Sequence, residues 1–224
     1  MDYNGNAWWH WLLGAVAVVA LCAVAVGITA LTGGTGSFLF AVALGALKGA
    51  AIGLGVGAVV GTEIGAVIGG IHALATGGDF WSGVGNGALL GLGIGAFAGA
   101  VIGAIAGGLS GANGWYNARA LEFTNVGTNN EVVIGKHINN SPYSYDAMAK
   151  QRGSTYFGTS QSRWNEVLRM KGVGEKGMWK INKAFLKQQM ALGKEFVITN
   201  DYIFGYLFKE VSYITSKGVA LFLI

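Results

Sequence analysis

Glycine recurs at every fourth position in two long rows of this chain, and this spacing restricts the folds open to it. Inside a soluble helix a glycine costs roughly 1 kcal/mol relative to alanine, so fifteen glycines held in register need a structural reason. Positions i and i+4 lie on one side of a helix, so each row forms a groove without side chains. Helices associate in lipid along such grooves. The rows are Gly45, Gly49, Gly53, Gly57, Gly61, Gly65 and Gly69, and Gly83, Gly87, Gly91, Gly95, Gly99, Gly103, Gly107 and Gly111.

Three apolar stretches are long enough to cross a membrane, at residues 11–31, 38–74 and 84–109. The first has 21 residues without a formal charge, about 32 Å of helix. The pattern predicts a three-helix, glycine-lined bundle whose last two helices form a hairpin. A four-residue repeat moves the groove about 40° around the helix at each step. The helices must therefore wrap tightly, or each row must meet more than one neighbour, including other copies of the chain.

Formal charge divides the chain into two unlike halves. Residues 1–118 hold 29 of the 39 glycines and only four charged side chains, whereas residues 119–224 carry a net charge of +6. We expect a membrane region over 1–118 and a small soluble domain over 119–224. Arg119 and the basic domain follow the last span, which favours a cytoplasmic location for that domain.

Glu63 is the ionisable residue with apolar sequence on both sides of it in the second stretch. Ionisable groups inside membrane spans are costly and often functional. One interpretation is a structural glutamate that is protonated or faces the interior of the bundle. The other is a role in proton-linked insertion or in a conducting path.

The second half alternates strand-like and helix-like segments. Strands are expected near 131–135, 155–157, 195–199 and 219–224, with helices near 145–151, 160–170, 177–192 and 203–216. On the helix after Gly177, apolar positions through Leu192 share one face. This order favours an α/β sandwich with a mainly parallel sheet, so the fold class is membrane α-helical plus a small α/β C-terminal domain.

In such sheets the ligand crevice lies beyond the carboxyl ends of the strands. That rule selects Lys136 and His137 after the first strand, Thr159 after the second, and Asn200 and Asp201 after the third. A Lys/His pair facing an Asp can serve acid–base chemistry or hold a phosphate. The alternatives are a helix cap or turn for Asp201 and a solvated loop position for His137. Metal-ligand spacing, phosphate loops and dinucleotide fingerprints are absent from the sequence, which predicts neither a metal nor a cofactor.

The basic excess also allows nucleic acid as a partner. Lys180, Lys183 and Lys187 lie on one side of a predicted helix and could follow a phosphate backbone, while Trp164 or Trp179 could stack bases. The alternative is the solvated side of an amphipathic helix.

Two resemblances extend these inferences. The rows over residues 45–111 resemble the two-helix glycine-zipper domains of bacterial envelope proteins. The segment Asp2-Tyr3-Asn4-Gly5-Asn6-Ala7-Trp8-Trp9-His10-Trp11 resembles the junction of RHS-repeat proteins, with Tyr3 in place of a proline. The layout that follows is also similar to the C-terminal segments of those proteins, and the sequence around 133–136, 178–186 and 196–201 resembles tip domains of polymorphic toxins.

The resemblance to RHS proteins implies a secreted or delivered effector. Glycine-zipper helices would insert in a bacterial membrane and deliver a cytotoxic α/β domain, a nuclease or nucleotide-consuming enzyme if it is an enzyme. The expected partners are the lipid bilayer, other copies of the chain through the glycine rows, and a small immunity protein that binds residues 119–224. The alternative is a glycine-zipper pore, or a structural envelope protein, without enzymatic activity.

Overall fold

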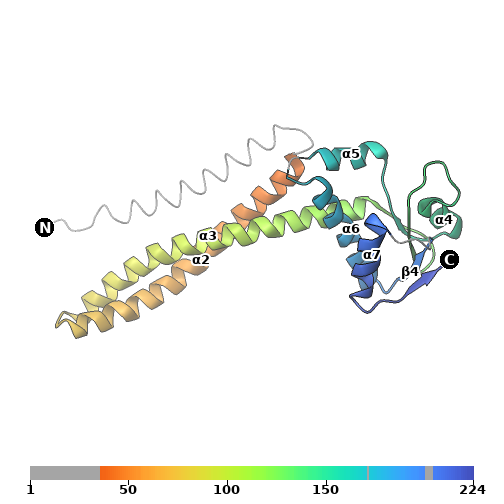
Figure 1. Cartoon of the computed structure of the whole chain (residues 1–224). Coiled ribbons are helices and arrows are strands. Elements are labelled where there is room, and N and C mark those ends of the chain that lie inside the picture. Colours follow the sequence, from red (N-terminus) through yellow and green to blue (C-terminus); the bar gives the residue numbers. More distant parts are fainter. Residues whose placement is uncertain (1–35, 171, 200–203) are drawn as a thin grey trace. The chain divides into compact units, whose positions relative to one another are not determined.

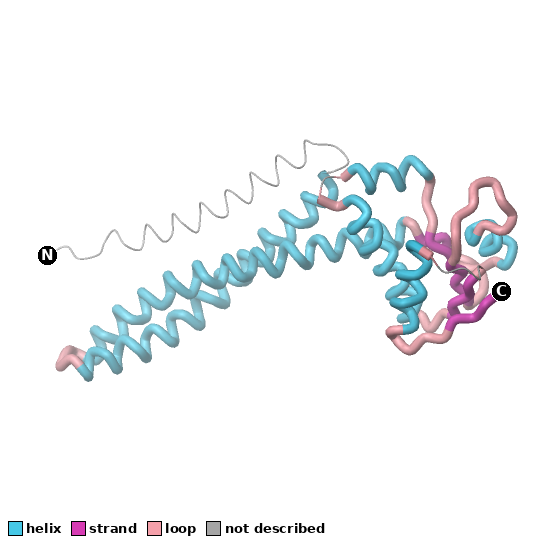
Figure 2. Tube along the Cα trace, viewed as in Figure 1, coloured by secondary structure: helices cyan, strands magenta, loops and turns pink. Residues whose placement is uncertain are grey.

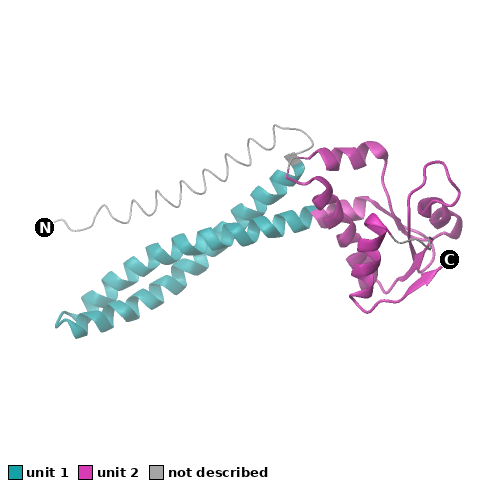
Figure 3. Ribbon diagram, in the orientation of Figure 1, with its two compact units in different colours: residues 1–115 teal, residues 116–224 magenta. Residues whose placement is uncertain are grey.

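The computed structural model describes residues 36–170, 172–199 and 204–224 of the chain. The chain divides into two compact units, Met1–Trp115 and Tyr116–Ile224, coloured separately in Figure 3. This division lies close to the boundary expected at residue 118. The expected first span, residues 11–31, and the junction-like segment, residues 2–11, lie outside the described residues.

The described part of the first unit is a helical hairpin. Helix α2 spans Gly36–Ala75, and α3 spans Phe80–Glu122 and continues into the second unit (Figures 1 and 2). In the turn between them Gly77 has a φ of 71°, a left-handed conformation that glycine adopts without strain. The backbone N–H of Ser82 donates to the Asp79 carboxylate at 2.7 Å, which caps the start of α3. Both helices are long and apolar enough to cross a membrane, as the sequence predicted for this pair.

The two glycine rows face each other along the hairpin. A Cβ atom added at Gly45 would lie 2.2 Å from the carbonyl oxygen of Gly107, and one at Gly69 would lie 2.2 Å from that of Gly83. The five row glycines between them meet α3 glycines in the same register, at 1.9–2.1 Å. No side chain fits at such distances. The sequence allowed either tight wrapping of the helices or contact of each row with several neighbours. The described helices wrap around each other, and the glycines of one row pack against those of the other.

Large apolar side chains lie on the outside of this hairpin. Ile52, Ile71, Leu89 and Ile102 are each at least 61% exposed, whereas the small Ala50 and Ala100 are among its buried residues. The glycine rows explain this inversion, because the backbones approach too closely to leave room for aliphatic side chains between them. The arrangement is the reverse of a soluble helical pair, which buries its large apolar side chains.

The second unit has two small sheets. Strands β2 (Glu131–Ile134), β4 (Glu195–Ile198) and β5 (Leu221–Leu223) form a parallel sheet in the order β2-β4-β5. Strands β1 (Thr124–Asn125) and β3 (Tyr156–Phe157) pair antiparallel. The parallel sheet agrees with the coarse class expected from the sequence. The expected strand at 155–157 belongs instead to the antiparallel pair, and a single bridge between Val132 and Thr155 links it to β2.

The helices of this unit are α4 (Tyr145–Arg152), α5 (Gln161–Arg169), α6 (Gly174–Ala191) and α7 (Gly205–Thr215). Local signals set several of their ends. Ser144 precedes α4, and Gly153 ends it with a left-handed φ of 67°. Ser160 caps α5, since its Oγ accepts from the backbone N–H of Arg163 at 3.4 Å. Helix α6 begins three residues before Gly177, and Leu192, expected on its buried face, is 68% exposed.

The core of this unit involves the parallel sheet, α4 and α6. Val133 of β2 packs with Ala149 of α4 and Tyr156 of β3. Phe196 of β4 and Ile181 and Phe185 of α6 are fully buried. The ring of Phe185 lies 5.3 Å from that of Phe157, which joins α6 to the antiparallel pair. This packing holds α6 against the antiparallel pair.

Candidate functional site

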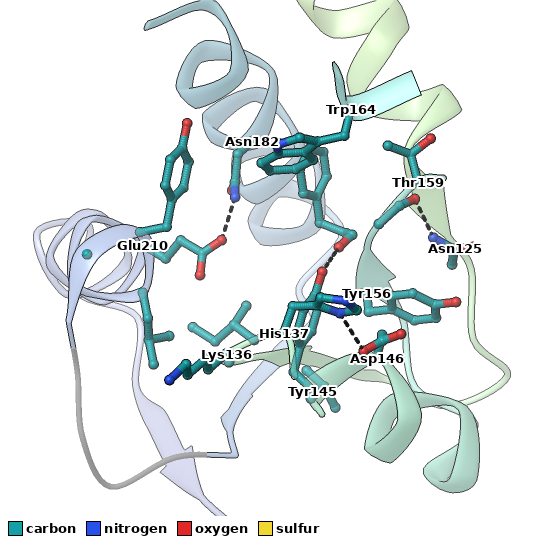
Figure 4. Close-up of a pocket in the computed structure, with 18 of the residues that line it drawn as sticks. Asn125, Lys136, His137, Tyr145, Asp146, Tyr156, Thr159, Trp164, Asn182 and Glu210 are labelled. Carbon is teal, nitrogen blue, oxygen red and sulfur yellow. Dashed lines mark hydrogen bonds and ion pairs between the residues drawn. The ribbon is translucent and has the colours of Figure 1, made fainter. Parts of the chain in front are cut away.

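A pocket of about 760 Å³ opens beyond the carboxyl end of β2 (Figure 4). Its lining comes from the end of β2 and the residues after it, α4, β3 and the loop after it, the start of α5, the start of α7, and one residue each of β1 and α6. The volume is within the usual range of small-molecule sites, about 300–1,000 Å³. The pocket lies where the rule for parallel sheets places a ligand crevice.

Three of the residues selected from the sequence line this pocket. Lys136 and His137 follow β2, and Thr159 follows β3. Asn200 and Asp201, selected with them, lie outside the described residues. Glu63 is exposed on α2, so it does not face the interior of the described helix pair.

His137 belongs to a hydrogen-bond network with Asp146. Its Nδ1 lies 3.2 Å from Asp146 Oδ1, and its Nε2 lies 3.0 Å from Asn139 Oδ1. Ser144 donates its hydroxyl to the same Asp146 oxygen and accepts from the backbone N–H of Ile138 at 3.0 Å. Burial disfavours the ionised form of Asp146, but the hydrogen bonds from Ser144 and His137 outweigh it, and the pKa is lowered. An ionised Asp146 can therefore orient the imidazole for proton transfer.

A second polar pair lies on the opposite side of the pocket. Glu210 is only 8% exposed, and the side-chain N–H of Asn182 donates to its Oε1 (Figure 4). Burial raises the pKa of Glu210 to about 7, and the hydrogen bond from Asn182 opposes that shift. Asn182 itself is 3% exposed, and its Oδ1 has no hydrogen-bond partner among the described residues. This side of the pocket therefore holds a buried carboxyl that Asn182 fixes in place and that exchanges a proton near neutral pH.

Aromatic side chains complete the walls. The Tyr145 hydroxyl donates to the carbonyl oxygen of Phe157, and burial raises its pKa, so it stays neutral. Trp164 lies beside Asn182 in Figure 4, and its ring centroid is 6.3 Å from that of Tyr206. Burial raises the pKa of Tyr206 to about 12. The pocket therefore has neutral aromatic walls beside its charged and polar groups.

Three residues of this pocket were not predicted from the sequence, namely Asp146, Asn182 and Glu210. The missed signal for Glu210 is its position on the apolar face of α7, with Leu207 three residues before it and Ile214 four residues after it. Asn182 similarly lies among the buried positions of α6. Asp146 looks like an ordinary acidic residue of a first helical turn.

Two of the lysines selected on α6 lie over aromatic rings of their own chain. Lys183 Nζ lies 4.7 Å from the ring centre of Tyr213, and Lys180 Nζ lies 5.1 Å from that of Tyr116. Trp179 also packs against Tyr213, with ring centroids 6.5 Å apart. Nucleic acid binding by this row stays a prediction.

Comparison of the chain with protein-family models, curated proteins and solved structures finds no match. The glycine hairpin and the pocket are therefore the features that bear on function.

Proposed function

We propose that this chain is an effector whose hairpin inserts in a bacterial membrane and carries the domain of residues 116–224 as its working part. The seven glycine pairs of the hairpin support insertion. They bring the two backbones so close that the large aliphatic side chains must point outward. In water those side chains would expose a large apolar surface, and the free-energy cost of that exposure is about 25 cal/mol per Å². In lipid that cost disappears, and close backbone packing favours the helical pair.

The length of α2 agrees with a tilted hairpin. Helix α2 has 40 residues and a length of about 60 Å, twice the hydrocarbon thickness of about 30 Å. Lys48 and His72 are separated by about 36 Å along it, so a tilt of about 35° would bring both to the interfaces. Glu63 would then lie inside the hydrocarbon region, where an ionised carboxylate is costly.

The pocket supports an enzymatic role for the carried domain. It is lined by the His137–Asp146 pair and by the buried Glu210, whose pKa of about 7 suits it to proton transfer near neutral pH. The resemblance of the sequence to RHS-type polymorphic toxins supports a cytotoxic role, with a nuclease or nucleotide-consuming activity in the cytoplasm of a target cell. An immunity protein that binds this domain belongs to the same proposal.

A second candidate is a pore, or a structural envelope protein, made by the hairpins themselves. The observation that favours it is the exposed Glu63 on the outer face of α2. Hairpins that associate through this face would cover the carboxyl group or place it along a conducting path. Because both rows are filled within one chain, such association would use the outer surface, and self-association through the rows stays a prediction.

Growth and membrane potential distinguish the two candidates when the full chain is expressed in a bacterium. The effector should arrest growth without depolarisation, and Glu210→Gln should abolish the arrest. A pore should depolarise the membrane, and Gly57→Leu should abolish that effect while Glu210→Gln leaves it unchanged. Gly55→Leu is the matched control, since nothing lies within 4 Å of a Cβ atom at that position. Failure of the full chain to float with liposomes would contradict insertion itself.

A further inference from the structure

The Glu210 carboxylate presents hydrogen-bond acceptors to the pocket. Asn182 donates its side-chain N–H to Glu210 Oε1, which fixes the carboxylate against α6 (Figure 4). The ionised carboxylate has further acceptor positions beyond the one that Asn182 occupies. A ligand that donates to this charged group should gain at least about tenfold in affinity for each hydrogen bond. The ligand must bring adjacent N–H donors.

The remaining surfaces of the pocket fit an anionic, planar molecule. Trp164, Tyr206 and Tyr156 provide aromatic faces, which are platforms for flat rings. The side opposite Asn182 and Trp164 carries a basic rim, the exposed Lys136 and His137, and the Asp146 carboxylate on this side is held by His137 (Figure 4). A nucleotide has two ends that match these surfaces. Its flat base offers hydrogen-bond donors and an aromatic face, and its phosphate is an anion that suits a basic rim.

The acceptors distinguish among the bases. Guanine offers two adjacent donors on its Watson–Crick edge, the ring N1–H and the N2 amino group. Adenine and cytosine place one amino donor beside a ring acceptor, and uracil has a single donor between two acceptors. We propose that this pocket binds a guanine nucleotide, with the base edge on the Glu210 carboxylate, which Asn182 positions, and the phosphate on the side of Lys136 and His137. The proposal rests on the proposed function only in taking this pocket as the working site, and it is independent of membrane insertion.

Isothermal titration calorimetry on the full chain in detergent micelles tests this assignment with five ligands. They are GMP, IMP, AMP, guanosine and inorganic phosphate. IMP lacks the 2-amino group, and we expect it to bind about tenfold more weakly than GMP, the loss of one hydrogen bond. AMP should bind about a hundredfold more weakly, because its ring acceptor would meet the carboxylate. Guanosine should bind about tenfold more weakly for lack of the phosphate.

Two variants test the residues. Glu210→Gln should weaken GMP binding at least about tenfold, because the Gln amide replaces an acceptor with a donor. Glu175→Gln is the matched control on α6, with an exposed carboxyl outside the pocket, and should bind GMP as the unaltered chain does. Circular dichroism verifies that each variant is folded, and the comparison of GMP with IMP needs no variant.

Several results would overturn the assignment. They are no GMP binding by the folded chain, equal affinity for GMP and AMP or IMP, phosphate binding as tight as GMP binding, and unchanged GMP affinity in Glu210→Gln. Growth assays separate this inference from the proposed function. GMP binding without growth arrest would contradict the effector alone, and arrest that depends on Glu210 without GMP binding would contradict the guanine site alone.

Discussion

A Cβ atom at Gly57 would lie 2.0 Å from the carbonyl oxygen of Gly95, and a Cβ atom at Gly95 would lie 2.1 Å from the carbonyl oxygen of Gly57. The contact is reciprocal, and the other row glycines of α2 make the same kind of contact with glycines of α3. Backbone therefore packs on backbone along the hairpin, a geometry in which dispersion and weak Cα–H···O contacts replace side-chain packing. Any side chain at these positions must push the helices apart.

The first prediction compares Gly57→Ala with Gly55→Ala. The Gly57 methyl group would meet the Gly95 carbonyl, and overpacking of this kind costs about 1–3 kcal/mol. At Gly55 the added Cβ meets nothing within 4 Å, so the better helix propensity of alanine should stabilise the hairpin by up to about 1 kcal/mol. The measurement is the unfolding free energy of the full chain in mixed micelles. Equal effects of the two substitutions would contradict the backbone contact.

The second prediction concerns Glu63. An ionised carboxylate at this exposed position opposes insertion into lipid, so liposome binding should be greater at about pH 5 than at about pH 8. Glu63→Gln removes the charge and should make binding nearly independent of pH. Lys48→Gln is the control, because a lysine nearer the helix end can reach the interface. Flotation assays measure the bound fraction, and an unaltered chain that binds equally at both pH values would refute the prediction.

The hairpin and much of the local structure could be predicted from the sequence, because short-range rules govern them. The four-residue glycine period marks the packed face of α2 and α3, and Ser144 and Gly153 mark the ends of α4. The pairing of β1 with β3 could not be predicted, since a two-residue strand carries no hydrophobic period. The contact of Asn182 with Glu210 joins α6 to α7 and depends on tertiary packing. Lys136 and His137 could be predicted because the ligand crevice of a parallel sheet lies beyond the carboxyl ends of its strands, and both residues follow β2.

The third prediction concerns the loop that positions His137. Ser144 is 2% exposed and accepts from the backbone N–H of Ile138 at 3.0 Å, so Ser144→Ala leaves that donor without its partner. We expect a loss of about 1–3 kcal/mol in unfolding free energy. Ser141→Ala in the same loop is the control. Its hydroxyl accepts the backbone N–H of Tyr143 at 3.2 Å in an exposed position, where water can replace it, so the expected change is below about 0.5 kcal/mol. Near-ultraviolet circular dichroism in a urea titration gives both values, and a larger effect at Ser141 would be inconsistent with this role for Ser144.

The last prediction follows from the burial of Glu210. Its pKa is about 7 in the folded chain, above the ordinary value of 4.5. The unfolded chain therefore releases this proton at lower pH than the folded chain does. The contribution of Glu210 to stability is fully present below about pH 4.5, falls as the pH rises to about 7, and stays constant above that. The total loss is on the order of 3 kcal/mol.

Glu210→Gln should remove this dependence and retain an acceptor for the Asn182 N–H, so the variant should be more stable than the unaltered chain at about pH 8. Glu175→Gln, on an exposed carboxyl of α6, should leave the dependence unchanged. Urea unfolding of the full chain in micelles at several pH values measures these slopes. A Glu210→Gln variant that still loses stability between about pH 5 and about pH 7 as the unaltered chain does would show that another group titrates there.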